Sequence, residues 1–217
     1  GGRYTGYDAT REGRKDLQLG VPDKRFAARI AMLNKVESSF QDKSMLAKSW
    51  KELRGQAVEV ILGEASKAFK VEQDAEYEDY KETSFGKDLL TAVRLIETGS
   101  KFITINYGGW DMHQNIETSL NNRQVQLDAY LAKLIDTLEK RGLYERVMLV
   151  VTSEFGRTPK VNANGGRDHW ARLAPLMISC GSYDMGRVVG TSDKNAEAPD
   201  DGLCEPEDLK WTIFDHL

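Results

Sequence analysis

The sequence contains few of the residues that form disulfides or zinc sites. It has only three histidines and two cysteines, and prolines are also few, at five. Cys180 and Cys204 are too few and too irregularly placed for a disulfide framework or a Cys-x-x-Cys metal site. Cys180 ends an apolar run and has no histidine near it in the sequence, so we interpret it as a small buried residue rather than a nucleophile.

The chain also lacks an excess of positive charge and any long apolar run. Lys and Arg together number 30 against 34 Asp and Glu, which gives a formal net charge of -4. Because no basic stripe with interleaved aromatic residues is present, we expect no nucleic-acid partner. No apolar run is long enough to predict a membrane span, and the first residues lack the apolar centre of a secretory signal. The composition, 40% hydrophobic and 29% charged, predicts a globular protein with a substantial core.

Both ends of the chain resemble cuts. The sequence has no initiator Met, and a helix that opens with Pro206 and acidic residues continues toward Leu217 without a glycine cap. We therefore expect a fragment or processed product of a longer protein, with parts of a site located elsewhere.

Residues 1–83 predict a polar arm and a helical region that belong to the same domain as the rest. Residues 1–21 are polar and aperiodic, which indicates an extended arm or loop. Two amphipathic helices follow, with a charged helical stretch at about 47–53 between them. The acidic and aromatic run 71–81 is interpreted as a solvated surface segment. The apolar residues at helical spacing are Phe26, Ile30, Leu33, Val36 and Phe40, then Val58, Ile61, Leu62, Ala65 and Phe69.

Residues 84–217 predict an α/β core. A helix that closes at Gly99 precedes the first strand, and a long amphipathic helix that ends at Arg141-Gly142 follows it. The continuous apolar run 146–152 is typical of a strand that is covered on both faces. Strand, helix and strand in this order predict a right-handed parallel crossover. The expected strands are 101–107, 146–152 and 174–180, with a short fourth at 187–190.

Three short segments carry the residues suited to chemistry. Two of the three histidines fall in these segments, each beside a carboxylate and near glycines that allow close approach of a ligand. The first two segments begin where predicted strands end, which in a parallel sheet is the edge where ligands bind. This pattern is typical of a divided metal or anion site. The segments are Gly108-Gly109-Trp110-Asp111-Met112-His113, Ser153-Glu154-Phe155-Gly156-Arg157-Thr158-Pro159 and Gly166-Arg167-Asp168-His169-Trp170.

The first segment contains a pair of metal-ligand types two positions apart. In an extended loop, alternation places the side chains of Asp111 and His113 on the same side, where they can chelate one cation. Oxygen and nitrogen donors suit zinc, manganese or iron. An interpretation of equal weight is a loop pair that makes only structural hydrogen bonds.

The second and third segments add charged groups of both signs. Glu154 directly follows a predicted strand and stands near Arg157, whose planar fork suits phosphate, sulfate or carboxylate. The alternative is an internal Glu154–Arg157 ion pair that stabilises the turn. His169 is flanked by Arg167 and Asp168, and Asp168 is either a ligand or an acceptor that orients an imidazole.

These motifs resemble those of a known family. Residues from about 84 to 217 resemble the C-terminal half of the bacterial family called domain of unknown function 1501, and residues 22–83 match it less distinctively. The family is grouped with the alkaline phosphatase and sulfatase superfamily. The resemblance implies a partial doubly wound, mostly parallel sheet flanked by helices, with a helical N-terminal region. It also implies a site of one or two metals.

The resemblance implies a role for each matching residue. Phe155 stands where the superfamily has the histidine of an Asp-His pair, which is a departure from the two-metal pattern. The superfamily's nucleophile and first metal-binding Asp have no convincing equivalent, since Thr5, Asp8 and Thr10 follow no apolar strand. The metal ligands that the resemblance implies are Asp111, His113, His169 and Glu154. Together with the chemistry of the residues, we expect Glu154 and Arg157 as catalytic residues and Arg157, Arg167 and Asp168 as substrate-binding residues.

From this resemblance we expect a metal-dependent hydrolase-like domain that acts on phosphate or sulfate esters. The expected cofactor is a divalent metal such as zinc, manganese or calcium, the expected partner is an anionic ester or polymer, and the expected location is the periplasm or cell envelope. Two alternatives stay open. One is a non-catalytic binding or structural protein that keeps the fold, and the other is a fragment that lacks the half carrying the nucleophile.

Overall fold

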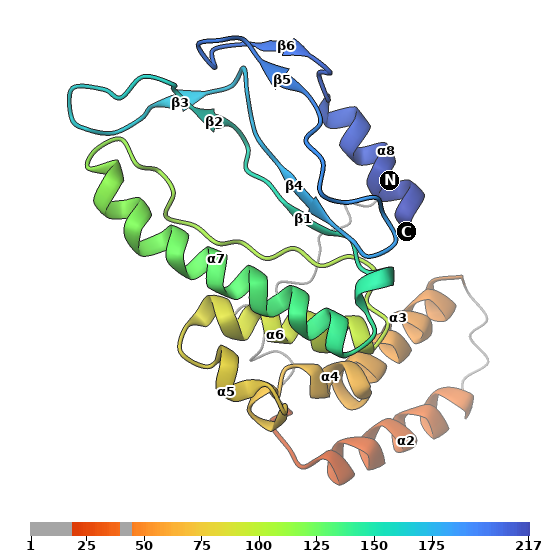
Figure 1. Ribbon diagram of the computed structural model, residues 1–217. Coiled ribbons are helices and arrows are strands. Elements are labelled where there is room, and N and C mark those ends of the chain that lie inside the picture. The colour runs from red at the N-terminus through yellow and green to blue at the C-terminus, as the bar shows by residue number, and fades with distance from the viewer. Residues whose placement is uncertain (1–18, 40–44) are drawn as a thin grey trace. The chain divides into compact units, whose positions relative to one another are not determined.

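The computed structural model describes residues 19–39 and 45–217 (Figure 1). Contacts divide the chain into two compact units, Gly1–Ile103 and Thr104–Leu217. This division falls later than the boundary at 83/84 that the sequence suggests, because the helix from Ser84 to Glu97 packs with the helices that precede it. Most of the predicted arm, residues 1–21, lies outside the described residues.

The first unit is helical in its described part. The predicted helix with Phe26, Ile30, Leu33 and Val36 is confirmed as α2, although Phe40 lies outside the described residues, and the helix before Gly99 is confirmed as α6. The second periodic stretch, 58–69, is divided between α3 and α4, and α3 also contains the charged stretch at 47–53. Thr83 caps α6, since its side chain accepts a hydrogen bond from the backbone N–H of Gly86 at 2.9 Å. Gly99, with φ of 95°, follows the end of α6 as the sequence predicts. The elements are α2 (Asp23–Ser39), α3 (Met45–Leu62), α4 (Glu64–Ala68), the 3-10 turn η1 (Val71–Gln73), α5 (Tyr77–Tyr80) and α6 (Ser84–Glu97).

The run 71–81 is only in part the solvated surface segment that its acidic composition predicted, because Glu72, Glu78 and Asp79 are exposed whereas two apolar residues are buried. Val71 and Tyr80 are 1% and 0% exposed. The acidic charge is compensated from α6, where Arg94 donates to the Asp74 carboxylate at 2.7 Å and to the backbone oxygen of Ala68 at 3.1 Å. The apolar side chains of this run therefore contribute to the core of the first unit.

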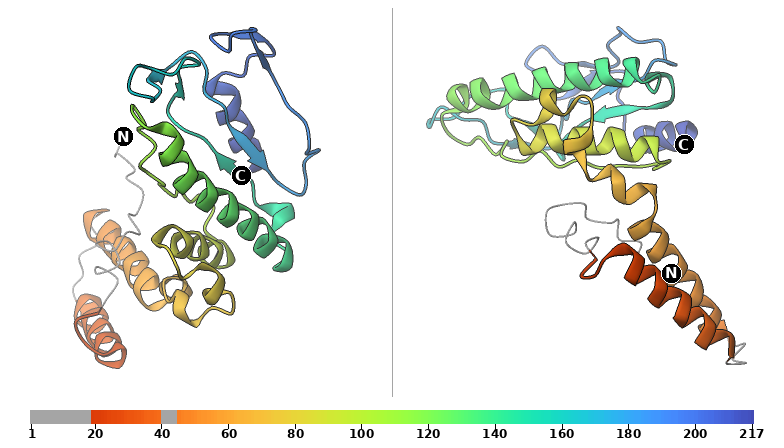
Figure 2. Two further views of the ribbon diagram at one scale, coloured as in Figure 1. Left: turned by 60° about the vertical axis from the view of Figure 1, so that its left-hand side comes forward. Right: turned by 90° about the horizontal axis from the view of Figure 1, so that it is seen from below.

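The second unit combines two long helices with short antiparallel strand pairs. β1 pairs with β4, β2 with β3, and β5 with β6. In Figures 1 and 2 the β2–β3 pair lies near the start of α7, and the β1–β4 pair lies nearer its end. The elements are α7 (Ile116–Lys140), η2 (Tyr144–Arg146), β1 (Leu149–Val151), β2 (Gly156–Arg157), β3 (His169–Trp170), β4 (Met177–Ser179), β5 (Thr191–Ser192), β6 (Pro199–Asp201) and α8 (Pro206–His216).

The strands differ from the sequence prediction in extent and direction. No ladder forms over 101–107 or 187–190, and the runs 146–152 and 174–180 contribute only β1 and β4. Val150 pairs with Ile178 in an antiparallel register rather than a parallel one. The reason lies in the connection, because β1 and β4 are joined through β2 and β3 and no crossover helix intervenes. A doubly wound, mostly parallel sheet stays a prediction.

The core of the second unit lies on one face of α7 and around η2. Tyr130, Leu134 and Leu138 of α7 are at most 7% exposed. Cys180 is fully buried, with its sulfur 3.8 Å from the backbone oxygen of Tyr144, which confirms its interpretation as a small buried residue. None of the helices in the described ranges is both long and apolar enough to cross a membrane.

Candidate metal centre

Two loops, distant in sequence, lie side by side through backbone hydrogen bonds. The N–H of Arg167 donates to the oxygen of Met112 at 3.0 Å, and the N–H of Ile116 donates to the oxygen of Gly165 at 2.9 Å. The side chain of Met112, between Asp111 and His113 in sequence, is buried. The loop before α7 is therefore held against the loop before β3.

A glycine allows this close approach. A Cβ atom at Gly166 would stand 2.0 Å from the carbonyl carbon of His113 and 2.3 Å from the backbone nitrogen of Gln114. Both contacts are with backbone, which has little freedom to move aside. The first Gly of the third motif is thus required for packing rather than for an unusual φ angle.

Asp111, His113 and His169 form a compact group of metal-ligand atoms. The Asp111 Oδ1 lies 2.7 Å from His169 Nε2 and 3.0 Å from His113 Nε2, and the two imidazole nitrogens are 3.2 Å apart. Ligands at 2.0–2.1 Å from a tetrahedral ion are separated by about 3.3–3.4 Å, so this set fits a small divalent cation after a slight expansion. The predicted convergence of these three residues is present in the structure.

The surroundings of the group keep Asp111 and the neighbouring Asp168 ionised. The pKa of Asp111 is lowered, first by the hydrogen bond with His169 and then by the one from Arg157. The pKa of Asp168 is lowered by hydrogen bonds with His113 and then Asn162. The side chains of Asp111, His113 and His169 are 66%, 44% and 49% exposed, so one side of the group is open to solvent.

Arg157 and Arg167 hold the loops together. Arg157 is 22% exposed and donates to the Asp111 carboxylate at 2.8 Å, to the oxygen of Trp110 at 2.9 Å and to the oxygen of Arg167 at 3.1 Å. Arg167 donates to the oxygens of Thr158 and Pro159 at 2.8 and 2.7 Å. Through these contacts the two arginines hold the backbone of the loops and the Asp111 carboxylate in place. The role in substrate binding that was expected for both residues stays a prediction.

The residues of the second motif make other contacts than those that were predicted for them. Glu154 is exposed and does not belong to the metal-ligand group found among the described residues. Arg157 pairs with Asp111, so the alternative ion pair between Glu154 and Arg157 is not what stabilises this turn. Phe155 instead packs on His169, with ring centroids 4.2 Å apart and planes 32° apart.

Comparison with known proteins assigns the chain to a family. The family model described as "Protein of unknown function (DUF1501)" matches residues 4–217. The chain belongs to this family. The match includes the helical region that the motifs alone left less distinct. No curated protein and no solved structure gives a significant match.

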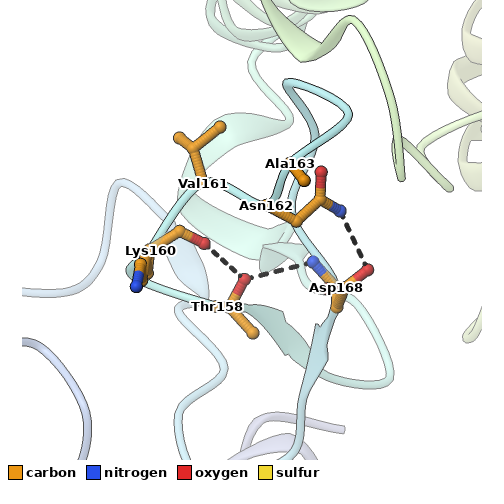
Figure 3. Close-up of a pocket in the computed structure, with 6 residues that line it drawn as sticks. All are labelled: Thr158, Lys160, Val161, Asn162, Ala163 and Asp168. Atoms are coloured by element: carbon orange, nitrogen blue, oxygen red, sulfur yellow. Dashed lines mark hydrogen bonds between the residues drawn. The ribbon is translucent and has the colours of Figure 1, made fainter.

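A shallow hollow adjoins the metal-ligand group of this DUF1501 chain. Its volume is about 360 Å³, and Figure 3 shows Asp168 among its lining residues. Asp168 links the hollow to the group because its carboxylate contacts His113 Nδ1 at 2.7 Å. The amide of Asn162 donates to the oxygen of His113 at 3.0 Å and to the Asp168 carboxylate at 3.1 Å. The sequence analysis missed Asn162, although its place at the start of Asn-Ala-Asn-Gly-Gly was a signal for a turn. The lining residues are Thr158, Lys160, Val161, Asn162, Ala163 and Asp168.

Proposed function

We propose that this DUF1501 chain is a metal-dependent hydrolase-like domain that acts on phosphate or sulfate esters, as in the alkaline phosphatase and sulfatase superfamily. The observation that supports it is the convergence of one carboxylate oxygen and two imidazole nitrogens within 4.8 Å of one another. Three protein ligands with an open side are typical of catalytic zinc sites, whereas structural sites are closed by four. The nitrogen donors favour zinc or manganese over calcium.

The chain's own groups have distinct roles in this proposal. Asp111, His113 and His169 hold the ion, and Arg157 holds the Asp111 carboxylate in place through a 2.8 Å hydrogen bond. The bound ion would supply Lewis acidity toward the ester oxygen and toward water. The solvent-exposed side of the group leaves room for an ester to approach. Glu154 follows β1 on the same loop as Phe155 and is exposed.

Metal analysis tests the first half of the proposal. Protein dialysed against zinc or manganese and then against buffer is expected to retain about one ion per chain, as one ligand set predicts. His113→Ala is expected to retain almost none. His216→Ala is the matched control, because it removes the same kind of side chain from α8, where His216 contacts Tyr183 and the oxygen of Arg146. Equal retention by all three proteins would refute the site.

An ester panel tests the second half. Aryl phosphate, phosphodiester and aryl sulfate substrates are assayed with metal-loaded protein, and His113→Ala is assayed beside it. Turnover that is lost in His113→Ala and retained in His216→Ala supports hydrolysis. Retention of the ion without turnover of any ester would reject hydrolysis while leaving the metal site intact.

A non-catalytic binding role is the second candidate, and one observation favours it. Arg157 and Arg167 donate to backbone oxygens and to a ligand, so they offer fewer N–H groups to an ester than their sequence positions suggest. A binding domain would take up inorganic phosphate or sulfate in its metal-loaded form and hydrolyse none of the panel. Calorimetric titration with these two anions distinguishes the candidates.

A further inference from the structure

The far side of the His113 ring faces a carboxylate that is not itself among the three converging ligands. Nδ1 of His113 lies 2.7 Å from Oδ1 of Asp168, while Nε2 of the same ring lies 3.0 Å from Asp111. The two ring nitrogens therefore have separate carboxylate partners. Only Nε2 faces Asp111 Oδ1, the oxygen that Nε2 of His169 also contacts.

The Asp168 contact determines which ring nitrogen carries the proton. An ionised carboxylate only accepts hydrogen bonds, and both ring nitrogens of His113 face one. The contact with Asp168 is the shorter, 2.7 Å against 3.0 Å, and Asp111 Oδ1 already accepts a hydrogen bond from Arg157, so the hydrogen of a neutral His113 ring resides on Nδ1. The lone pair is then on Nε2, directed toward Asp111 and His169. We infer that Asp168, held by Asn162, is the positioning residue that sets the tautomer of His113. The use of this tautomer for metal binding rests on the proposed function.

Asp168 is itself fixed from several directions (Figure 3). Its backbone N–H donates to the Thr158 hydroxyl at 3.1 Å, and its backbone oxygen accepts from the Thr158 N–H at 2.9 Å. The Asn162 amide nitrogen joins Asp168 to the His113 backbone. The Asn162 side-chain oxygen accepts from the N–H of Gly166 at 3.0 Å, which holds the amide in one orientation. One asparagine side chain thus sets the spacing between the ring of His113 and its carboxylate partner.

His169 is positioned by a different means. Its Nε2 contacts Asp111 at 2.7 Å, and one ring face packs on Phe155. Ring stacking restricts orientation but does not select a tautomer, because it involves no donor or acceptor. A change at Asp168 is therefore expected to act on His113 directly, and it reaches His169 only through the 3.2 Å contact between the two Nε2 atoms. His216 of α8, which contacts Tyr183 and the oxygen of Arg146, serves as the internal control in the same molecule.

The tautomer is measured by long-range proton–nitrogen NMR of metal-free protein labelled with ¹⁵N-histidine, at alkaline pH where imidazole is neutral. His113→Gln identifies the His113 signals. Wild type is expected to show His113 protonated on Nδ1. Asp168→Ala is expected to give a mixture of tautomers at His113, with the signals of His216 unchanged. Asp184→Ala, which removes an exposed carboxylate of the same unit, is expected to change none of them.

Zinc affinity is the second readout, measured by competition with a chromophoric chelator. Asp168→Ala is expected to weaken binding about 10–100-fold, as for other partners of metal-ligating histidines. Asp168→Asn keeps an acceptor oxygen and nearly the same shape, so it is expected to retain the Nδ1–H tautomer with an intermediate affinity. It also serves as the test if Asp168→Ala fails to fold.

Two results would overturn the inference: a wild-type His113 protonated on Nε2, or an Asp168→Ala protein whose His113 tautomer is unchanged. If wild type binds no zinc, the proposed function fails. The tautomer measurement still decides the role of Asp168, because it uses metal-free protein. A shift of the His113 tautomer alone would then support positioning by Asp168 in a site of different purpose.

Discussion

A single added methyl group at Gly166 is expected to disrupt the candidate metal centre without removing any of its three proposed ligands. In Gly166→Ala the new Cβ would stand 2.0 Å from the carbonyl carbon of His113, where ordinary contact begins at 3.4 Å. The two loops would have to separate by about 1.4 Å, the difference between these distances. His113 would move with its backbone, away from Asp111 and His169.

The cost of this separation follows from the hydrogen bonds that span the two loops. The Arg167 N–H to Met112 oxygen bond, at 3.0 Å, and the Asn162 amide to His113 oxygen bond, also at 3.0 Å, would exceed hydrogen-bonding distance. Loss of two such bonds and the accompanying strain give about 2–5 kcal/mol of destabilisation. Zinc affinity is expected to fall at least about tenfold, since a ligand is displaced.

Gly108→Ala is the matched control, because a Cβ at Gly108 meets no atom within 4 Å. Both variants are compared with wild type by urea unfolding, monitored by circular dichroism, and by chelator competition for zinc. Gly108→Ala is expected to match wild type in both assays. The packing argument would be refuted if Gly166→Ala were as stable as Gly108→Ala and bound zinc equally well.

Three further predictions concern charged groups. Asp74→Ala is expected to destabilise the chain by about 3–5 kcal/mol in urea unfolding, because it leaves the mostly buried Arg94 without its anion. Arg157→Lys is expected to weaken zinc binding about tenfold in chelator competition, since an ammonium cannot span one carboxylate and two carbonyls. The pKa values of Asp111 and Asp168 are lowered, so their contribution to stability is present above about pH 3.9 and is lost as pH falls through the lower folded-state pKa values. Urea unfolding at successively lower pH is expected to show a shallower acid dependence when both are changed to Asn.

The helices were predictable because helical periodicity is a local property. Leu120, Leu134 and Leu138 recur at the spacing of one helix face, and α7 contains all three. Strand pairing is not local. The run Val147–Val151 is apolar enough for a fully covered strand, but its partner depends on the connection, which here contains a hairpin and no helix.

Burial of the apolar residues of the run 71–81 was missed for a related reason. Its acidic residues indicated solvent exposure, and the compensating Arg94 lies 20 positions away from Asp74 in sequence. A charge that is neutralised by a distant residue has the same sequence signature as one that is solvated. Only the packing of α6 on the preceding helices distinguishes the two.

The metal-ligand group was predictable from the kinds of residue in the motifs, but the supporting contacts were not. Asp111, His113 and His169 were singled out because histidines are rare in this chain and stand beside carboxylates. The contact between Asp168 and His113 depends on the path of two loops, so the sequence left its role open between ligand and orienting acceptor. Glu154 was expected as a ligand from the family resemblance, and the structure places it outside the group found among the described residues.

The long separation between the donors has a thermodynamic consequence. His113 and His169 stand 56 positions apart, with all of α7 between them, so an unfolded chain offers no preformed chelate. Uptake of an ion would then be coupled to folding of the second unit, and free zinc at about 100 times the dissociation constant would add about 2.7 kcal/mol to its stability. Chelators would act on this chain as mild denaturants, and the ion supply of its surroundings would influence how long it survives proteolysis.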